Sequence, residues 1–153
     1  MKNMKEPLPK NVLFVCTGNT CRSPMAQALY NAIAEEKKLD TSAQSAGVDA
    51  YEGMPASIGA VGAMEKYSID ISLHCATQVR QSMLEQADVV LAMNGGQARA
   101  LCRMFPGQAD KVTTLSEYAF GSYEPVDDPF GGDAAAYEAC ASELLGAIKQ
   151  ILM

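Results

Sequence analysis

Residues 15–24, VCTGNTCRSP, place a cysteine, an arginine and a serine at a spacing that could hold a phosphoryl group beside a sulfur nucleophile. Cys16 ends an apolar run, and the thiolate form of cysteine is a strong nucleophile. Arg22 carries a planar guanidinium that can bind two phosphate oxygens at once. Because five residues separate Cys16 from Arg22, the chain between them can curve around one tetrahedral anion. Ser23 is then placed to donate a hydrogen bond to the sulfur and improve it as a leaving group.

The residue types between Cys16 and Arg22 favour an anion-binding turn. Gly18 tolerates a positive φ, and Asn19 is among the few other residue types that adopt one. Such a turn directs backbone N–H groups inward, and a helix that begins near Ser23 adds its N-terminus. The same field stabilises a thiolate. We therefore predict a phosphate-binding loop made of Cys16, Thr17, Gly18, Asn19, Thr20, Cys21, Arg22 and Ser23.

Each of these residues also has an ordinary structural explanation. A cysteine at the end of a buried strand is most often a small apolar side chain, and a Ser-Pro pair opens many helices. Neither explanation accounts for Arg22, because a guanidinium beside a buried strand end requires an anion. The phosphate-binding interpretation is therefore favoured.

This loop has to join a strand to a helix, and the rest of the chain repeats that alternation. Apolar runs predict strands at 12–15, 41–47, 88–93 and 111–115. A first helix is expected from about Ser23, with Ser23 as N-cap and Pro24 as the first helical residue. Further helices are expected at 55–67, 78–87, 95–105 and 133–152, and Asp133 should cap the last of them. The pattern predicts an α/β domain with a mostly parallel sheet covered on both faces. Residues 116–132 show neither the apolar periodicity of a helix nor that of a strand, so we expect a long functional loop there.

Length and composition limit the class of protein. The 153 residues suit one domain, and the net charge of −6 argues against nucleic acid or an anionic membrane as a partner. No apolar run approaches the roughly 18 residues of a membrane span, and the N-terminus lacks the pattern of a signal peptide, so we expect a cytoplasmic protein. The five cysteines show no CxxC spacing, which is unlike a disulfide framework or a zinc site. We expect no metal and no cofactor.

The stretch CTGNTCRSP resembles the signature C-x-G-N-x-C-R-S-P of the low-molecular-weight protein phosphatase family. The resemblance extends to SAG at 45–47, IDISLH at 69–74, DVVLAM at 88–93 and DPFGG at 128–132. It implies a single domain over 1–153, with residues 1–10 as a flexible extension. The implied fold is a three-layer α/β/α sandwich whose four-stranded parallel sheet has the order 2-1-3-4. It also implies that Asn19, Ser45 and His74 form a network with Ser23 that supports the loop, so we interpret His74 as structural.

The same resemblance identifies the second catalytic group. A cysteinyl-phosphate mechanism needs a proton donor for the leaving group and then a base for water. From the local sequence alone, Asp127-Asp128-Pro129 is best explained as an acidic turn. The family's general acid is the aspartate of an Asp-Pro pair in this late loop, which implies Asp128. The neighbouring carboxylate of Asp127 would favour the proton-bearing form of Asp128.

Two substrate classes occur in the family, phosphotyrosine and phosphoarginine. The combination of Thr20 with DPFGG resembles the bacterial protein-arginine phosphatases. A threonine hydroxyl suits a polar guanidinium, Asp128 could pair with it, and Phe130 could stack on either group. We expect phosphoarginine, with phosphotyrosine as the alternative. Thr20 could instead serve only the packing of the loop.

Several further expectations concern redox chemistry and partners. We expect oxidation to form a Cys16–Cys21 disulfide that protects Cys16 from irreversible oxidation, with a packing role for Cys21 as the less favoured alternative. A thiol-dependent arsenate reductase is less favoured, because Cys75, Cys102 and Cys140 lie far apart in sequence. A non-catalytic phosphate-binding module is also less favoured, since the chain keeps both the nucleophile and the acid. We expect a monomer that takes a phosphorylated protein or peptide and releases inorganic phosphate.

Overall fold

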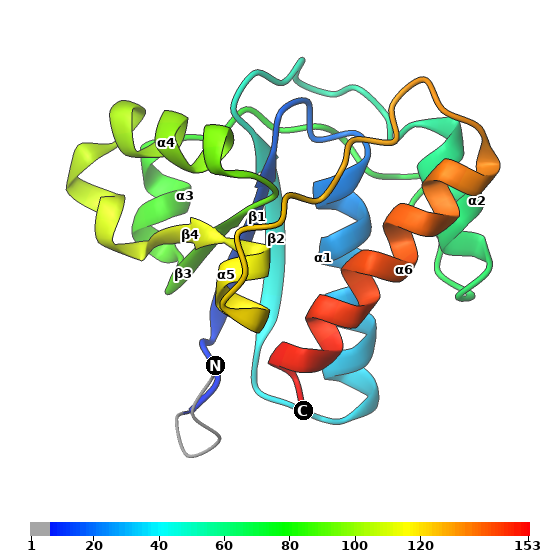
Figure 1. Cartoon of the computed structure of the whole chain (residues 1–153), viewed down its shortest axis with the longest axis horizontal. Helices are drawn as coiled ribbons and strands as arrows, with labels where there is room; N and C mark the ends of the chain where they lie inside the picture. The colour runs from blue at the N-terminus through cyan, green and yellow to red at the C-terminus, as the bar shows by residue number, and fades with distance from the viewer. Residues whose placement is uncertain (1–6) are drawn as a thin grey trace.

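Four parallel strands form one sheet in the computed structural model of the chain, which describes residues 7–153 (Figure 1). The strands are β1 (Asn11–Cys16), β2 (Ser42–Gly47), β3 (Val89–Ala92) and β4 (Val112–Thr114), and their order is β2-β1-β3-β4. Every pairing between neighbouring strands is parallel. The expected sheet order is therefore confirmed. Since β1 and β3 are the inner strands, their nearly continuous apolar sequences are buried on both faces.

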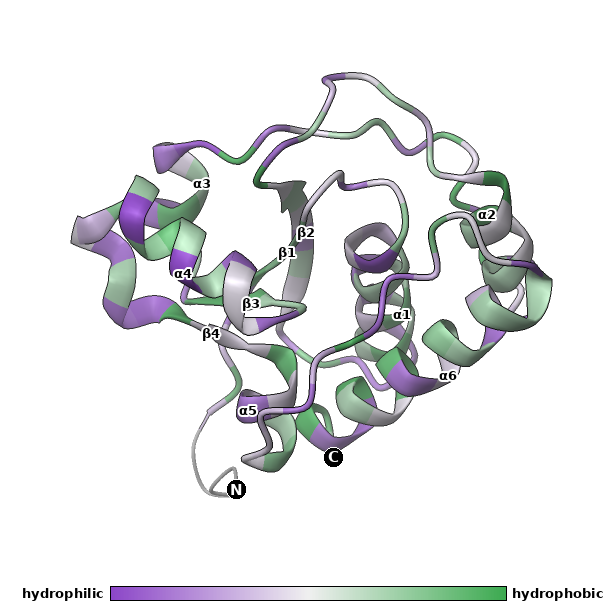
Figure 2. Ribbon diagram, turned by 45° about the horizontal axis from the view of Figure 1, so that its top comes forward, coloured by the Kyte–Doolittle hydropathy of each residue, from purple (hydrophilic) through white to green (hydrophobic). Residues whose placement is uncertain are grey.

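Helices cover both faces of this sheet, as Figure 2 shows from a second direction. They are α1 (Arg22–Glu36), α2 (Ile58–Glu65), α3 (Gln81–Gln86), α4 (Gly95–Met104), α5 (Leu115–Phe120) and α6 (Ala134–Ile151), with a short 3-10 helix at Pro106–Lys111. Successive residues of β1 point to opposite faces, so Phe14 packs with α1 and α6 and Leu13 packs with α3 and α4. The result is the expected α/β/α arrangement.

The expectation of a long loop over 116–132 is wrong in its first part, because α5 occupies residues up to Phe120. The Thr114 hydroxyl caps this helix by accepting from the Glu117 N–H, and Gly121 ends it in the left-handed region at φ 68°. A six-residue helix is too short to show a clear apolar period in the sequence, although both of its caps are typical. From 121 to 133 the chain forms neither helix nor strand.

The start of α1 also differs from the expectation. The helix begins at Arg22, and Cys21 rather than Ser23 occupies the N-cap position, without a capping side-chain hydrogen bond. The Ser23 hydroxyl is used elsewhere, as described below. The other predicted cap is confirmed, since the Asp133 carboxylate accepts from the Ala136 N–H at the start of α6.

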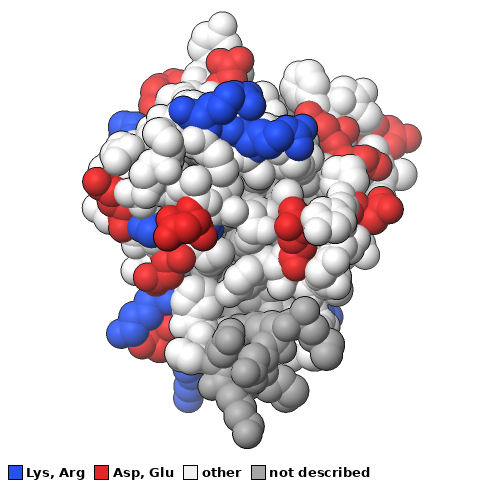
Figure 3. Space-filling model, turned by 60° about the vertical axis from the view of Figure 1, so that its left-hand side comes forward, with Lys and Arg blue, Asp and Glu red and all other residues white. Residues whose placement is uncertain are grey.

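Residues 1–6 of the expected N-terminal extension lie outside the described residues. In the rest of it, Leu8 packs against the core and the Pro9 carbonyl accepts a hydrogen bond from the Thr41 hydroxyl. Within residues 7–153, no helix is both long enough and apolar enough to cross a bilayer. On the face shown in Figure 3, basic side chains at the top are flanked by acidic ones, so both signs of charge are mixed there.

Candidate active site

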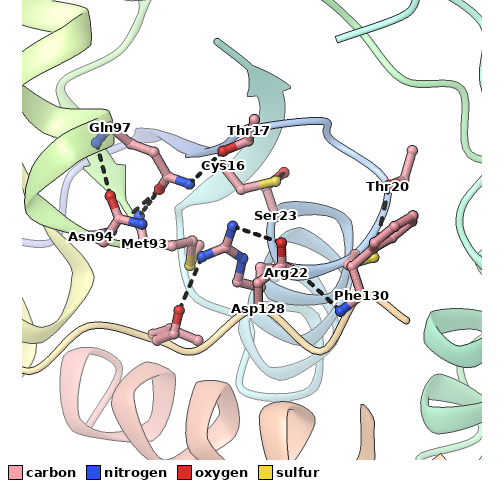
Figure 4. A network of polar contacts seen from close by, with 12 residues as sticks. Cys16, Thr17, Thr20, Arg22, Ser23, Met93, Asn94, Gln97, Asp128 and Phe130 are labelled. Atoms are coloured by element: carbon pink, nitrogen blue, oxygen red, sulfur yellow. Dashed lines mark hydrogen bonds and ion pairs between the residues drawn. The ribbon is translucent and has the colours of Figure 1, made fainter. Parts of the chain in front are cut away.

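The loop between β1 and α1 surrounds a pocket of about 200 Å³ at the carboxyl end of the sheet. Its lining includes Cys16, Thr20 and Arg22 from the loop and Asp128 and Phe130 from the segment before α6. Figure 4 shows these side chains around one point, although the two segments are far apart in sequence. Inner parallel strands that end beside a helix N-terminus form a common place for anion binding.

The sulfur of Cys16 lies 2.8 Å from the Ser23 hydroxyl oxygen, and both side chains are buried. Asn19 Nδ2 donates a hydrogen bond to the same Ser23 oxygen at 2.8 Å. Because that oxygen already accepts from Asn19, the hydroxyl hydrogen is available to the sulfur. The Ser23 hydroxyl can thus donate a hydrogen bond to the Cys16 sulfur, which explains why Ser23 does not cap the helix.

Asn19 lies at the centre of the loop, is fully buried and has a φ of 57°. Its Nδ2 also donates to the Ser45 hydroxyl at 3.0 Å, and its Oδ1 accepts from the Thr77 N–H at 2.9 Å. Its carbonyl oxygen lies 2.8 Å from His74 Nε2, which must be the donor because a carbonyl can only accept. The structure thus brings together Asn19, Ser23, Ser45 and His74. The left-handed residue of the turn is Asn19, whereas Gly18 does not have a positive φ.

Arg22 is the buried cation of the site, with 4% of its surface exposed. Its Nη1 donates to the Val126 carbonyl at 3.0 Å, and its Nη2 lies 3.5 Å from Asp128 Oδ2. Its Nε is buried and has no hydrogen-bond partner among the described residues. A buried guanidinium N–H without a partner is costly, so this atom indicates a position for an anionic acceptor.

Asp128 and Phe130 form the outer wall of the pocket. Asp128 Oδ1 accepts a hydrogen bond from the Phe130 N–H at 3.0 Å, which fixes the carboxylate relative to the backbone of the same turn. About half of the Asp128 side chain is exposed, and Phe130 is 73% exposed at the mouth. The carboxylate can therefore reach both the Arg22 side and solvent.

Gln97, at the start of α4, supports the loop and is missing from the residues predicted from sequence. Its side-chain Oε1 accepts from the backbone N–H groups of Met93 and Asn94, and its Nε2 donates to the Thr17 hydroxyl at 3.1 Å (Figure 4). The spacing of Asn94 and Gln97 is that of a capping box, which is readable in the sequence. The contact with Thr17 is not, because it depends on how β3 sits beside β1.

Gly47, at the end of β2, lets the loop approach the sheet closely. A Cβ atom at this position would lie 2.4 Å from the Thr17 carbonyl oxygen and 3.0 Å from the Asn19 nitrogen. Both are backbone atoms of the loop, so they cannot move without displacing it. The glycine is therefore required by the position of the loop.

Cys21 faces away from solvent on the α2 and α6 side of the loop. Its thiol donates to the Ser57 hydroxyl at 3.3 Å, and its sulfur lies 3.6 Å from the Tyr137 hydroxyl. Burial raises the pKa of Tyr137, with the neighbouring Cys21 adding to the effect and a hydrogen bond with Ser57 opposing it. The phenol therefore stays protonated near neutral pH. All five cysteines are free.

Comparison with known proteins gives consistent matches along almost the whole chain. Residues 11–153 match the family described as low molecular weight phosphotyrosine protein phosphatase. A protein-arginine-phosphatase of Bacillus subtilis is 40% identical over 92% of this chain and 93% of its own length. A low molecular weight protein-tyrosine-phosphatase of Streptomyces coelicolor is 36% identical over 91% of this chain and 93% of its own. The crystal structure of a low molecular weight protein tyrosine phosphatase from T. tengcongensis superposes with a TM-score of 0.91 at 45% identity, covering 94% of this chain and 97% of that one.

Proposed function

Because the chain belongs to the low molecular weight phosphotyrosine protein phosphatase family, and is thus a cysteine-dependent protein phosphatase, we propose that its substrate is phosphoarginine in proteins. In this proposal Cys16 is the nucleophile, Arg22 binds the phosphoryl oxygens and Asp128 is the general acid and base. One observation above all supports these roles: Arg22 Nε is buried without a hydrogen-bond partner among residues 7–153, in a pocket that Cys16 and Asp128 also line.

The first step forms a cysteinyl-phosphate. The Cys16 thiolate attacks phosphorus, an S–P bond forms and the P–N bond of phosphoarginine breaks. The electron pair of that bond stays on the guanidine nitrogen, which takes a proton from Asp128. Arg22 and the loop N–H groups hold the phosphoryl oxygens, and such fixed donors stabilise the charge of the transition state.

The second step releases inorganic phosphate. Asp128, now a carboxylate, takes a proton from a water molecule as the water attacks phosphorus. The S–P bond breaks and its electron pair returns to sulfur. The Ser23 hydroxyl, which lies 2.8 Å from that sulfur, stabilises the departing thiolate.

The preference for arginine rests on the wall of the pocket. Thr20 presents a hydroxyl on the wall of the pocket, and Asp128 places a carboxyl group on the same wall, where the carbonyl oxygen of its protonated form can still accept a hydrogen bond. A guanidinium gains hydrogen bonds from both groups, whereas a phenol gains from apolar walls. Phe130 can stack on the planar guanidinium at the mouth. The B. subtilis relative named a protein-arginine-phosphatase is in line with this choice.

A pair of peptides of identical sequence, one with phosphoarginine and one with phosphotyrosine, tests the substrate. We expect kcat/KM to be at least about tenfold higher for phosphoarginine, since a pocket built around a polar group discriminates by this order or more. Thr20→Ile should narrow the difference by weakening hydrolysis of phosphoarginine. Cys16→Ser should abolish turnover of both peptides. A wild-type preference for phosphotyrosine would overturn the substrate while leaving the roles of Cys16 and Arg22 untouched.

Phosphotyrosine is the second candidate, because the exposed ring of Phe130 could also flank a phenol and the S. coelicolor relative is named a tyrosine phosphatase. Relay of a disulfide, as arsenate reduction requires, has no support in the positions of the other cysteines. Cys75 is exposed, Cys102 lies in α4 and Cys140 is buried in α6.

A further inference from the structure

A second hollow of about 720 Å³ lies between α2 and α6, next to the active-site pocket. This hollow is lined by Ile58, Gly62 and Ala63 of α2, by Phe130 of the loop before α6, and by Tyr137 of α6. We refer to this hollow as the α2–α6 groove. Figure 1 shows the two helices side by side, with the orange segment that leads into α6 arching above their upper ends.

The groove adjoins the pocket, because the two share the side chain of Phe130. Phe130 lines both, so its ring forms the ridge between them. Ser57, on the groove side, donates its backbone N–H to the Thr20 carbonyl at 2.9 Å. Tyr137 and Ser57 both contact the sulfur of Cys21. Thr20 and Cys21 thus line the pocket on one side and contact groove residues on the other.

Gly62 leaves the groove open, although no neighbouring atom requires a glycine at this position. It lies inside α2, where glycine destabilises a helix relative to alanine, and a Cβ atom there would meet nothing within 4 Å. Gly59 in the same helix differs, because its Cβ would lie 2.3 Å from the Tyr137 ring. Packing therefore requires Gly59, whereas Gly62 only preserves space. Ile58 adds an apolar side chain that is 92% exposed at the edge.

We propose that the α2–α6 groove binds the part of the substrate polypeptide next to the phosphorylated residue, and that an apolar side chain of this part lies between α2 and α6. The groove's position beside the pocket indicates what binds in it. When the phosphorylated side chain lies in the pocket, the neighbouring residues of the same polypeptide lie at Phe130, which separates the pocket from the groove. An apolar side chain suits the carbon-rich lining, and the ion pair between Lys66 and Glu138 gives the groove a polar edge. The proposal rests on the phosphoprotein substrate of the proposed function and not on which residue is phosphorylated.

Filling the groove provides the test. Gly62→Leu places a side chain in the groove, and Gly146→Leu is the matched control, because Gly146 is an exposed glycine of α6 whose Cβ would also meet nothing. The substrates are free phosphoarginine, an aryl phosphate, and phosphopeptides with leucine or serine beside the phosphorylated residue. We expect Gly62→Leu to lower kcat/KM about tenfold for the leucine peptide, mainly through KM, and to leave the small substrates within about twofold. Gly146→Leu should change neither.

A second variant guards against an effect on folding. Ile58→Asp removes the exposed apolar side chain at the first position of α2, where an acidic residue favours the helix. It should selectively weaken hydrolysis of the leucine peptide as well. Equal activity of Gly62→Leu and Gly146→Leu on every peptide would overturn the proposal, as would an equal loss on small substrates and peptides. The comparison uses whichever phosphorylated residue the wild type hydrolyses, so it can fail or succeed independently of the arginine preference.

Discussion

Arg22 Nη2 lies 3.5 Å from Asp128 Oδ2, so the first residue of α1 and the loop before α6 meet across the pocket. The same guanidinium donates through Nη1 to the Val126 carbonyl at 3.0 Å. In the proposed mechanism Arg22 would therefore both face the phosphoryl group and hold the segment that carries the proposed acid, Asp128. The two proposed steps would use groups from opposite walls of the pocket, and the Arg22 side chain contacts both walls.

Arg22→Lys is expected to lower kcat/KM by about 10²–10³-fold, although the charge is kept. Lysine cannot contact two phosphate oxygens and the Val126 carbonyl together, and loss of such a fixed donor costs about this much in other enzymes. Steady-state kinetics with the preferred phosphopeptide measure the loss. Inhibition by inorganic phosphate should weaken in parallel, and a lysine variant with nearly normal phosphate inhibition would contradict the assignment.

Asp128→Asn should lower kcat by about 10²–10⁴-fold, the usual contribution of a general acid and base. The loss should be smaller with an aryl phosphate whose phenol is acidic, because such a leaving group needs little protonation. Asp127→Asn is the comparison variant: Asp127 is exposed and does not line the pocket, so its replacement should lower kcat far less and act only through its neighbour Asp128. If both variants lose activity equally, the Asp-Asp pair contributes charge and not a specific acid.

Gln97→Met is expected to lower activity, although residue 97 does not line the pocket. Methionine fits a similar space but cannot donate to the Thr17 hydroxyl, so Thr17, which directly follows the proposed nucleophile Cys16, loses its support. A double-mutant cycle with Thr17→Val isolates this contact from the lost Met93 and Asn94 hydrogen bonds, which are common to both arms. We expect a coupling of about 1 kcal/mol in kcat/KM. Strict additivity would remove Gln97 from the positioning network.

The sequence was most informative where one short segment contains all the residues of a site, as in the phosphate-binding loop. Residues 16–23 include the proposed nucleophile, the turn and the guanidinium, so their order alone predicts a phosphate-binding loop. The alternation of strands and helices predicts the α/β class. Gln97 and Tyr137 could not be found in this way, because their contacts with Thr17 and Cys21 depend on the packing of β3 and α6 against the loop. The sequence named Gly18 and Asn19 as the two residues that could take a positive φ, and of these only Asn19 does so. Side-chain bonds to Thr77 and Ser45 hold Asn19 in the left-handed region, leaving Gly18 free of it.

Cys140 should resist thiol reagents near pH 8 while Cys75 reacts. Burial, with a smaller contribution from Glu143, raises the pKa of the Cys140 thiol to about 12, whereas Cys75 is exposed. Since the folded protein holds this proton more tightly than the unfolded chain, stability is retained below about pH 9 and falls as the pH rises toward 12. Cys140→Ala should show a shallower loss of unfolding free energy between pH 9 and 10.5 in urea titrations. Mass spectrometry after alkylation checks the reactivity, and early labelling of Cys140 in the folded protein would contradict the burial argument.

Reversible inactivation by peroxide is the last prediction, and it depends on Cys21. Peroxide would oxidise Cys16 to a sulfenic acid, and attack by the Cys21 sulfur would then form a disulfide and release water. To do so, Cys21 must give up its hydrogen bond to Ser57 and its contact with Tyr137, so the disulfide state should loosen the loop from α2 and α6. Wild type should recover activity with dithiothreitol after an excess of peroxide, whereas Cys21→Ser should lose it progressively as Cys16 is oxidised further. Cys75→Ser, at an exposed cysteine outside the pocket, should behave as wild type. Full recovery of Cys21→Ser would show that Cys21 serves the packing of the loop against Ser57 and Tyr137 and not the protection of the nucleophile.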